Sequence, residues 1–294
     1  MRRVLGDAYR AIAAPFGARA VERMLRDGLP PRLATPLRVL FGGAVPPQAA
    51  AAAASIESLR AGLAARRETY RFAPIEDALG PLRMVVAGGD IPSSFFANAA
   101  SVSRRWGLFL HLCAEAFEAR AVLELGACFG ISGAYLASGR SRPHLVTIEA
   151  SDALAPVAEA TLAAFTESAE VMRGTFEARL PEALARLGSV DVAYVDGHHD
   201  EAATLHYVRT IAPRLASNAL VVLDDIRLYR EMWRAWTSVA AMRGVAAAVD
   251  TGRFGLLVWI GGDAVPRPYD LARYTGWWRA GRSRRETMAP EPNL

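Results

Sequence analysis

The sequence lacks lysine altogether, so all 34 of its basic residues are arginine, against 30 acidic residues. The net charge is only +4 and the arginines are scattered, so the pI near 9.4 does not by itself indicate a nucleic-acid-binding protein. Cys113 and Cys128 are the only cysteines, which excludes a disulfide framework or a thiolate metal site. No apolar run approaches the roughly 20 residues that a membrane-spanning helix needs. The composition therefore predicts a cytoplasmic, globular protein with no membrane span and no nucleic-acid partner.

Three regions follow one another along the chain. Residues 1–100 are predicted to be a mainly helical accessory or lid region, because the stretch 48–67 is rich in alanine, and prolines make the rest of the region irregular. Residues 101–262 alternate between strand and helix signals, and residues 263–294 are a predicted C-terminal tail. A basic run in this tail could contact phosphates or a membrane surface, although a solvated tail is the simpler interpretation. The run consists of Arg279, Arg282, Arg284 and Arg285, beside Trp277 and Trp278.

Five short apolar runs separated by helical segments predict a parallel sheet that helices cover on both faces. The runs are residues 121–126, 144–150, 170–174, 190–197 and 219–226. Two further runs, 245–250 and 254–260, are joined by three residues, too few for a crossover helix, and so predict an antiparallel hairpin at the sheet edge. The predicted fold class is α/β: a Rossmann-like, doubly wound and mostly parallel sheet with an antiparallel C-terminal hairpin, preceded by a helical region.

The sharpest motif, Val122–Gly130, spans the first predicted strand and the turn after it. Gly126 ends the strand where a side chain would block a ligand, and Gly130 opens a helix whose free N–H groups can bind a polar group. A dinucleotide dehydrogenase would carry G-x-G-x-x-G, but the glycines here are Gly126, Gly130 and Gly133. Glu124 lies inside the strand, where its carboxylate would be buried, and burial of a carboxylate is costly unless it is paired or has a function. A glycine turn of any α/β protein is the structural alternative.

Glu149 ends the second predicted strand, roughly 20 residues past the glycine turn, where a Rossmann-like site has its ribose-binding acid. One carboxylate can accept hydrogen bonds from two vicinal hydroxyl groups. This position favours a bound nucleoside without choosing between adenosine-containing cofactors. A surface-exposed strand end is the alternative.

Together with Arg173-Gly174-Thr175, Val195–His199 and Leu223–Asp225, these motifs resemble the class I S-adenosylmethionine-dependent methyltransferases, specifically the small-molecule O-methyltransferase group. The resemblance covers residues 100–262. It implies S-adenosylmethionine as cofactor and methyl transfer to a small-molecule acceptor, with a hydroxyl oxygen as the expected target. The cofactor-binding residues that it implies are Ser103, Glu124, Gly126, Ala127, Gly130, Glu149, Ala150, Gly174, Thr175 and Asp196.

Three acids follow the fourth and fifth predicted strands: Asp196, Asp224 and Asp225. The carboxyl ends of the strands form the ligand crevice of an open α/β sheet, and gathered carboxylates repel one another unless a cation or protons intervene. In related O-methyltransferases acids at these places hold a divalent metal, so the resemblance implies a Mg²⁺ site formed by these three residues. The Asp-Asp pair departs from the Asp-Asn of catechol-type relatives, and capping of the following helix is the alternative.

His199 matches the histidine of the family's D-G-x-H pattern. The resemblance implies a catalytic pair of His199 and Asp196, in which the imidazole takes the acceptor proton. Packing beside the adenine, or a hydrogen bond to the crossing helix, is the alternative for this histidine.

Other functions stay open at this point. An NAD(P)-dependent oxidoreductase would need the dinucleotide fingerprint and a catalytic Tyr-Lys or similar pair, and the chain has no lysine. A nucleic-acid methyltransferase of the amino-directed type would carry Asn/Asp-Pro-Pro-Tyr after the fourth strand, where this chain has Asp-Gly-His-His. A non-catalytic binding module would be expected to lack the three acids. A homodimer is the commonest soluble assembly and is the assembly to test.

Overall fold

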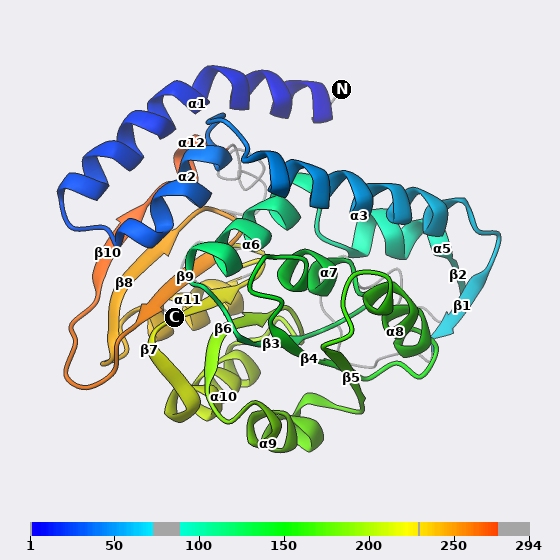
Figure 1. Ribbon diagram of the computed structural model, residues 1–294. Coiled ribbons are helices and arrows are strands. Elements are labelled where there is room, and N and C mark those ends of the chain that lie inside the picture. Colours follow the sequence, from blue (N-terminus) through cyan, green and yellow to red (C-terminus); the bar gives the residue numbers. More distant parts are fainter. Residues whose placement is uncertain (1, 73–88, 229, 276–294) are drawn as a thin grey trace, which may run out of the picture. The chain divides into compact units, whose positions relative to one another are not determined.

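The computed structural model describes residues 2–72, 89–228 and 230–275 (Figure 1). The chain forms two compact units, which we call the central unit (Val45–Val192) and the terminal unit (Met1–Ala44 with Ala193–Leu294). The predicted region 1–100 thus contributes to both units. The basic run at residues 279–285 lies outside the described residues.

The central unit contains a three-stranded parallel sheet. β3 pairs with β4 and β4 pairs with β5, so the carboxyl ends of the three strands point the same way. The strands are β3 (Ala121–Leu125), β4 (His144–Glu149) and β5 (Ala169–Arg173), connected by α7 (Ile131–Ala137), α8 (Ala155–Ala163), and followed by α9 (Phe176–Leu187). Apolar residues of β3 and β4 are fully buried, as expected for strands with helices on both faces.

Among the described residues before β3, the central unit is helical apart from one antiparallel pair of strands, the hairpin of β1 and β2. α3 (Pro47–Ala65) is the predicted alanine-rich helix, and it packs on α6 (Arg104–Ala116) and α7. Alanine has the highest helix propensity, and Pro47 at the first turn needs no N–H partner. The hairpin was not predicted from the sequence. It and the short helices that follow it are β1 (Thr69–Phe72), β2 (Gly89–Pro92), α5 (Ser93–Phe95) and the π-helix η3 (Phe96–Ala100).

The terminal unit holds the antiparallel part of the sheet, in the order β10-β8-β9-β7-β6. The strands are β6 (Val190–Val195), which begins in the central unit, β7 (Leu215–Leu223), β8 (Val245–Asp250), β9 (Gly255–Trp259) and β10 (Arg267–Asp270). β8 and β9 form the predicted antiparallel hairpin, and β9 also pairs antiparallel with β7. The prediction that this hairpin forms the sheet edge is wrong, because β10 pairs in parallel with β8 and becomes the outer strand.

Helices complete the terminal unit. The first helix packs against the last one, and the Tyr9 hydroxyl donates to the Arg273 carbonyl at 2.6 Å (Figure 1). The helices are α1 (Arg2–Arg26), η1 (Pro31–Leu33), α2 (Ala34–Leu40), α10 (Glu201–Ile211), η4 (Ala212–Arg214), α11 (Arg230–Ala240) and α12 (Ala272–Thr275). The predicted fold class is confirmed: an α/β Rossmann-like fold with parallel strands, antiparallel C-terminal strands and N-terminal helices. Among the described helices, none is long and apolar enough to cross a membrane.

Candidate functional site

The glycine turn after β3 depends on left-handed backbone. Gly126 has φ +101° and Gly130 has φ +75°, conformations that glycine adopts without steric cost. A Cβ atom on Gly130 would also lie 3.0 Å from the Ala158 carbonyl oxygen on α8. The N–H groups of Gly126 and Ala127 both donate to the Ile148 carbonyl, so the turn is fixed to the end of β4. The turn is therefore a rigid platform whose first amides already have partners.

Gly133 serves a different purpose, because it lets α7 lie directly on Glu124. A Cβ atom at Gly133 would lie 2.8 Å from Oε2 of Glu124. The Glu124 carboxyl group is fully buried, and neither of its oxygens has a hydrogen-bond partner in the described structure. Burial raises the pKa of Glu124 to about 7. The predicted cofactor residue thus lies beneath α7 rather than at the surface of the turn, and a role in cofactor binding stays a prediction.

Glu149, at the end of β4, is the acidic residue bonded to the glycine turn. Its Oε2 accepts a hydrogen bond from the Cys128 N–H at 2.8 Å, and its Oε1 accepts one from the Ser151 N–H at 2.8 Å. Burial raises the pKa of the Glu149 carboxyl, while these two bonds and one from Ala150 act in the opposite direction. The side chain is half-buried, and the three amide donors leave at least one of its four acceptor positions open to a further donor. This carboxylate is held in a fixed orientation at the carboxyl end of β4, beside the glycine turn.

The other predicted cofactor residues of the central unit lie at the ends of elements. Gly174 has φ +137° and donates its N–H to the Glu149 carbonyl, which joins the β5 end to the same platform. Thr175 is the N-cap of α9, and its hydroxyl accepts from the Ala178 N–H at 3.3 Å. Ser103 is the exposed N-cap position of α6, where its side chain makes no capping bond. The structure brings Gly126, Glu149 and Gly174 together by backbone bonds, whereas within the described residues no backbone hydrogen bond joins Ser103 to them.

In the terminal unit, Asp224 lies at the centre of the predicted acidic cluster. Its carboxylate is fully buried and makes a two-bond ion pair with Arg253: Nε donates to Oδ1 and Nη2 donates to Oδ2, both at 2.7 Å. The Asp225 N–H donates to Oδ1 at 2.6 Å, and the Tyr194 hydroxyl lies 2.7 Å from Oδ2. Burial by itself would raise the pKa of Asp224, but the Arg253 charge outweighs it and holds that pKa below its usual value. Asp224 is therefore an ionised, fully bonded carboxylate.

Tyr194 connects Asp224 to Asp196. Its hydroxyl oxygen is 3.0 Å from Oδ2 of Asp196, and one O–H group cannot donate to both carboxyls. Burial, and next the negative charge of Asp224, raise the pKa of Asp196 well above its usual range. The consistent pattern is that Tyr194 donates to Asp224 and that a protonated Asp196 donates to Tyr194. A chain of hydrogen bonds thus runs from Arg253 through Asp224 and Tyr194 to Asp196.

His199 faces the other oxygen of Asp196. Its Nε2 atom is 3.7 Å from Oδ1 of Asp196, and its Nδ1 atom is buried without a hydrogen-bond partner. The two side chains are 14% and 21% exposed, so both remain reachable from solvent. His198 instead stacks on Tyr207 and bonds its hydroxyl. The predicted pair of His199 and Asp196 is therefore adjacent in the structure, without a direct hydrogen bond.

The predicted Mg²⁺ site does not fit these residues. Four donors already occupy the four lone-pair positions of Asp224, and the Arg253 guanidinium also lies 3.9 Å from Oδ1 of Asp225. Within the described residues, no group of three or more His, Cys, Asp or Glu side chains is placed to hold a metal ion. The capping alternative does not describe Asp224 either, because its oxygens bond Arg253, Tyr194 and the Asp225 amide.

Arg253 and Tyr194 are the two members of this cluster that the sequence analysis missed. Tyr194 lies within an apolar strand and resembles any core tyrosine. Arg253 belongs to the four residues joining β8 and β9, which the sequence marked only as a tight connection. An arginine at the tip of a hairpin that follows two acids was the available signal.

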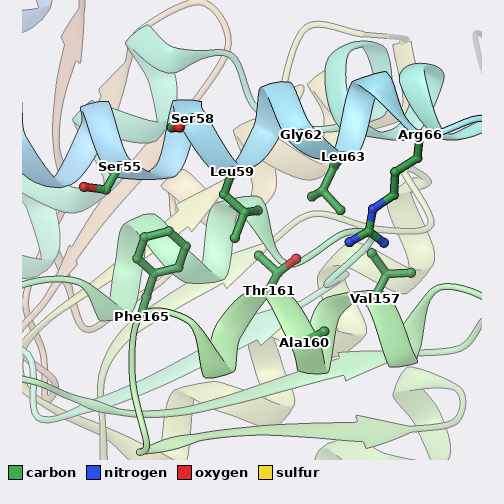
Figure 2. A pocket seen from close by; sticks show the side chains of 10 residues that line it. All are labelled: Ser55, Ser58, Leu59, Gly62, Leu63, Arg66, Val157, Ala160, Thr161 and Phe165. Atoms are coloured by element: carbon green, nitrogen blue, oxygen red, sulfur yellow. The ribbon is translucent and has the colours of Figure 1, made fainter.

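A separate hollow lies between α3 and α8 of the central unit (Figure 2). It has a volume of about 470 Å³, and Figure 2 shows Leu59 and Arg66 on α3 extending toward α8. None of the predicted site residues lines it. Its lining consists of Ser55, Ser58, Leu59, Gly62, Leu63, Arg66, Val157, Ala160, Thr161 and Phe165.

The known proteins to which this chain is similar include a methyltransferase domain family and several O-methyltransferases. Residues 123–226 match the model of a methyltransferase domain family. Over 150 residues the chain is 31% identical to the catechol O-methyltransferase of Mycobacterium tuberculosis (strain ATCC 25618 / H37Rv), covering 47% of this chain and 66% of that protein. The chain thus spans slightly less than two thirds of this relative's length.

Solved structures of O-methyltransferases are also similar. One is TomG from Streptomyces achromogenes, involved in tomaymycin synthesis and solved with S-adenosylmethionine, at 27% identity and a TM-score of 0.48, covering 55% of this chain and 82% of that one. Another is the O-methyltransferase from Bacillus cereus solved with S-adenosylhomocysteine, at 17% identity and a TM-score of 0.44, covering 71% and 90%. Residues 123–226 thus match a methyltransferase domain, and the curated relative and the motifs at Gly126 and Glu149 make this chain similar to the class I S-adenosylmethionine-dependent methyltransferases of the small-molecule O-methyltransferase group.

Proposed function

We propose that this chain transfers the methyl group of S-adenosylmethionine to a hydroxyl oxygen of a small molecule. The observation that carries the proposal is the geometry of Glu149, whose two oxygens are oriented by the Cys128 and Ser151 amides beside the glycine turn. A carboxylate fixed in this way suits two vicinal ribose hydroxyls. The name of the M. tuberculosis relative supports a hydroxyl acceptor of the catechol kind.

The residues of the central unit bind and orient the donor in this proposal. Glu149 accepts hydrogen bonds from the ribose, while Gly126 and Gly174 leave room for the nucleoside because neither has a side chain. The bound sulfonium supplies an activated methyl group, so the reaction needs alignment more than covalent assistance. The carbon–sulfur bond breaks as the oxygen–carbon bond forms, and the electron pair of the broken bond stays on sulfur.

The acceptor loses its hydroxyl proton during the transfer, and we assign His199 to accept it. Its Nε2 atom faces Asp196, which can orient the ring, although the 3.7 Å separation is longer than a hydrogen bond. Metal assistance is not part of this proposal, because the three acids do not fit a metal site. We also propose that residues 1–100 select the acceptor. A homodimer and a cytoplasmic location are further proposals.

Calorimetric titration with S-adenosylmethionine and, separately, with NADH tests the proposal. We expect the methyl donor alone to bind, and Glu149→Gln to weaken binding because it removes the charge that the ribose hydroxyls meet. Glu167→Gln, at an exposed glutamate of the same unit, is the matched control and should bind as the wild type does.

An activity assay with catechol as acceptor then separates transfer from binding. His199→Ala should lower turnover without lowering donor affinity, if His199 accepts the proton. A folded protein that binds NADH and not S-adenosylmethionine would refute the proposal in favour of an oxidoreductase.

A further inference from the structure

We infer that Arg253 takes the place that a divalent cation would fill in the acidic cluster, so that this chain neutralises its acceptor-side acids without a metal ion. The inference rests on the proposed methyltransferase function, but its first test measures metal binding, which does not require methyl transfer. The sequence predicts that Asp196, Asp224 and Asp225 bind Mg²⁺, but in the structure their contacts are to Arg253, to Tyr194 and to one another.

The hydrogen bonds of Asp224 leave no position for a metal. Its two oxygens accept from Arg253 Nε and Nη2, from the Tyr194 hydroxyl and from the Asp225 N–H, all at 2.6–2.7 Å. A carboxylate has about four acceptor positions, so a metal on Asp224 would have to displace at least one of these donors. Loss of an arginine bond would leave a buried cation less well paired, which is costly. The two-bond ion pair therefore competes directly with metal coordination.

The other two candidate ligands are tied to the same guanidinium. Arg253 Nε lies 3.9 Å from Oδ1 of Asp225, and Asp196 is joined to Asp224 through the Tyr194 hydroxyl. A divalent ion between these acids would lie close to a fixed positive charge, and like charges repel strongly where water is excluded. Arg253 is 19% exposed, so it is held mainly by protein contacts rather than by solvent.

The fold fixes Arg253 in this position. In the pairing of β7 with β9, Leu223 lies opposite Gly255, so the residues after Leu223 meet the residues before Gly255. The Ile226 N–H donates to the Arg253 carbonyl at 3.1 Å and holds the backbone of the connection. The guanidinium is thus delivered to Asp224 by strand register, as a built-in cation. Arg253 acts through Asp224 and is a positioning residue rather than a catalytic one.

Mn²⁺ binding by the full chain, followed by electron paramagnetic resonance, tests the inference. We expect the wild type to bind no stoichiometric Mn²⁺ up to millimolar concentrations. Arg253→Met should acquire Mn²⁺ binding, because it frees the Asp224 oxygens, and the additional change Asp224→Asn should abolish it. Arg243→Met, which removes an exposed arginine paired with Asp263, is the matched control and should bind none.

Stoichiometric Mn²⁺ binding by the wild type that Asp224→Asn removes would overturn the inference, as would a folded Arg253→Met protein that binds no Mn²⁺. Circular dichroism establishes that each variant folds, and the wild-type measurement holds even if Arg253→Met does not. A methyltransferase assay in EDTA, with and without added Mg²⁺, gives the second result: unchanged turnover is expected. A protein that binds no S-adenosylmethionine would refute the proposed function instead, and would leave the Mn²⁺ result standing.

Discussion

Replacement of Glu124 by glutamine should remove a pH dependence of folding stability that the wild type carries. The Glu124 carboxyl is fully buried under α7, and burial raises its pKa from an ordinary 4.5 to about 7. Between these two values the folded chain keeps a proton that the unfolded chain releases. The free energy of unfolding therefore falls as the pH rises through this window.

The magnitude follows from the size of the shift. Each pH unit by which folded and unfolded pKa values differ corresponds to about 1.4 kcal/mol, so Glu124 should account for about 3 kcal/mol between pH 4 and pH 8. Glutamine has the same shape and no titrating proton, so the Glu124→Gln protein should lose this part of the slope. Asp250, whose pKa burial also raises, titrates in both proteins and cancels in the difference. Glu149 does not cancel completely, because its charge contributes to the raised pKa of Glu124.

Urea denaturation followed by circular dichroism at several pH values between 4 and 8 gives the two stability curves. Glu167→Gln, at an exposed position, is the control and should keep the wild-type slope. Parallel curves for Glu124→Gln and the wild type would refute the reasoning, since they would mean that the buried carboxyl is paired or hydrated after all.

Two further predictions concern packing in the central unit. Gly133→Ala should lower stability by about 1–3 kcal/mol in thermal denaturation, because its Cβ would lie 2.8 Å from Glu124 Oε2. Gly62→Ala, with open space around it, is the control and should cause no loss. Equal melting temperatures for both variants would contradict this prediction. Arg60→Met should cost about 3 kcal/mol, because the buried guanidinium donates to two carbonyl groups of the segment 97–102 at 2.5 and 2.6 Å. Hydrogen exchange should then become faster in that segment, and wild-type exchange rates there would show that the clamp is not needed.

The strand and helix order could be predicted from the sequence because its signals are local. Each parallel strand is an apolar run, and the runs at 121–126 and 144–150 end within one residue of β3 and β4. The three-residue link before Phe254 left no alternative to an antiparallel hairpin, which the register of β8 and β9 confirms. β10 was missed because Arg267–Asp270 contains a proline and charged residues, features that argue against a strand and are tolerated only at a sheet edge.

The contacts of the acidic cluster could not be predicted in the same way. Asp224 and Arg253 are 29 positions apart, and they meet only because Leu223 pairs with Gly255 in the sheet. A shift of the register by one residue would send the Arg253 side chain elsewhere. A resemblance to metal-binding relatives names the acids but says nothing of a cation supplied by the connection between β8 and β9. The sequence therefore predicted Mg²⁺ where the structure has a guanidinium.

Four residues of the candidate site have the left-handed backbone conformation. In the described part of the chain, Cys128, His198, His199 and Asp225 all have φ between +49° and +58°, although none is glycine. Such a conformation is unfavourable for residues with a side chain, and glycine would adopt it at lower cost. The Cys128 and Asp225 amides donate from these turns to acidic side chains, of Glu149 and of Asp224 respectively. Glu118, Arg142 and Asn218, outside the candidate site, also have positive φ. Asp and His are among the residues that enter this region most readily. The conformation therefore positions the two amides and does not by itself assign a function to His199 or Asp225.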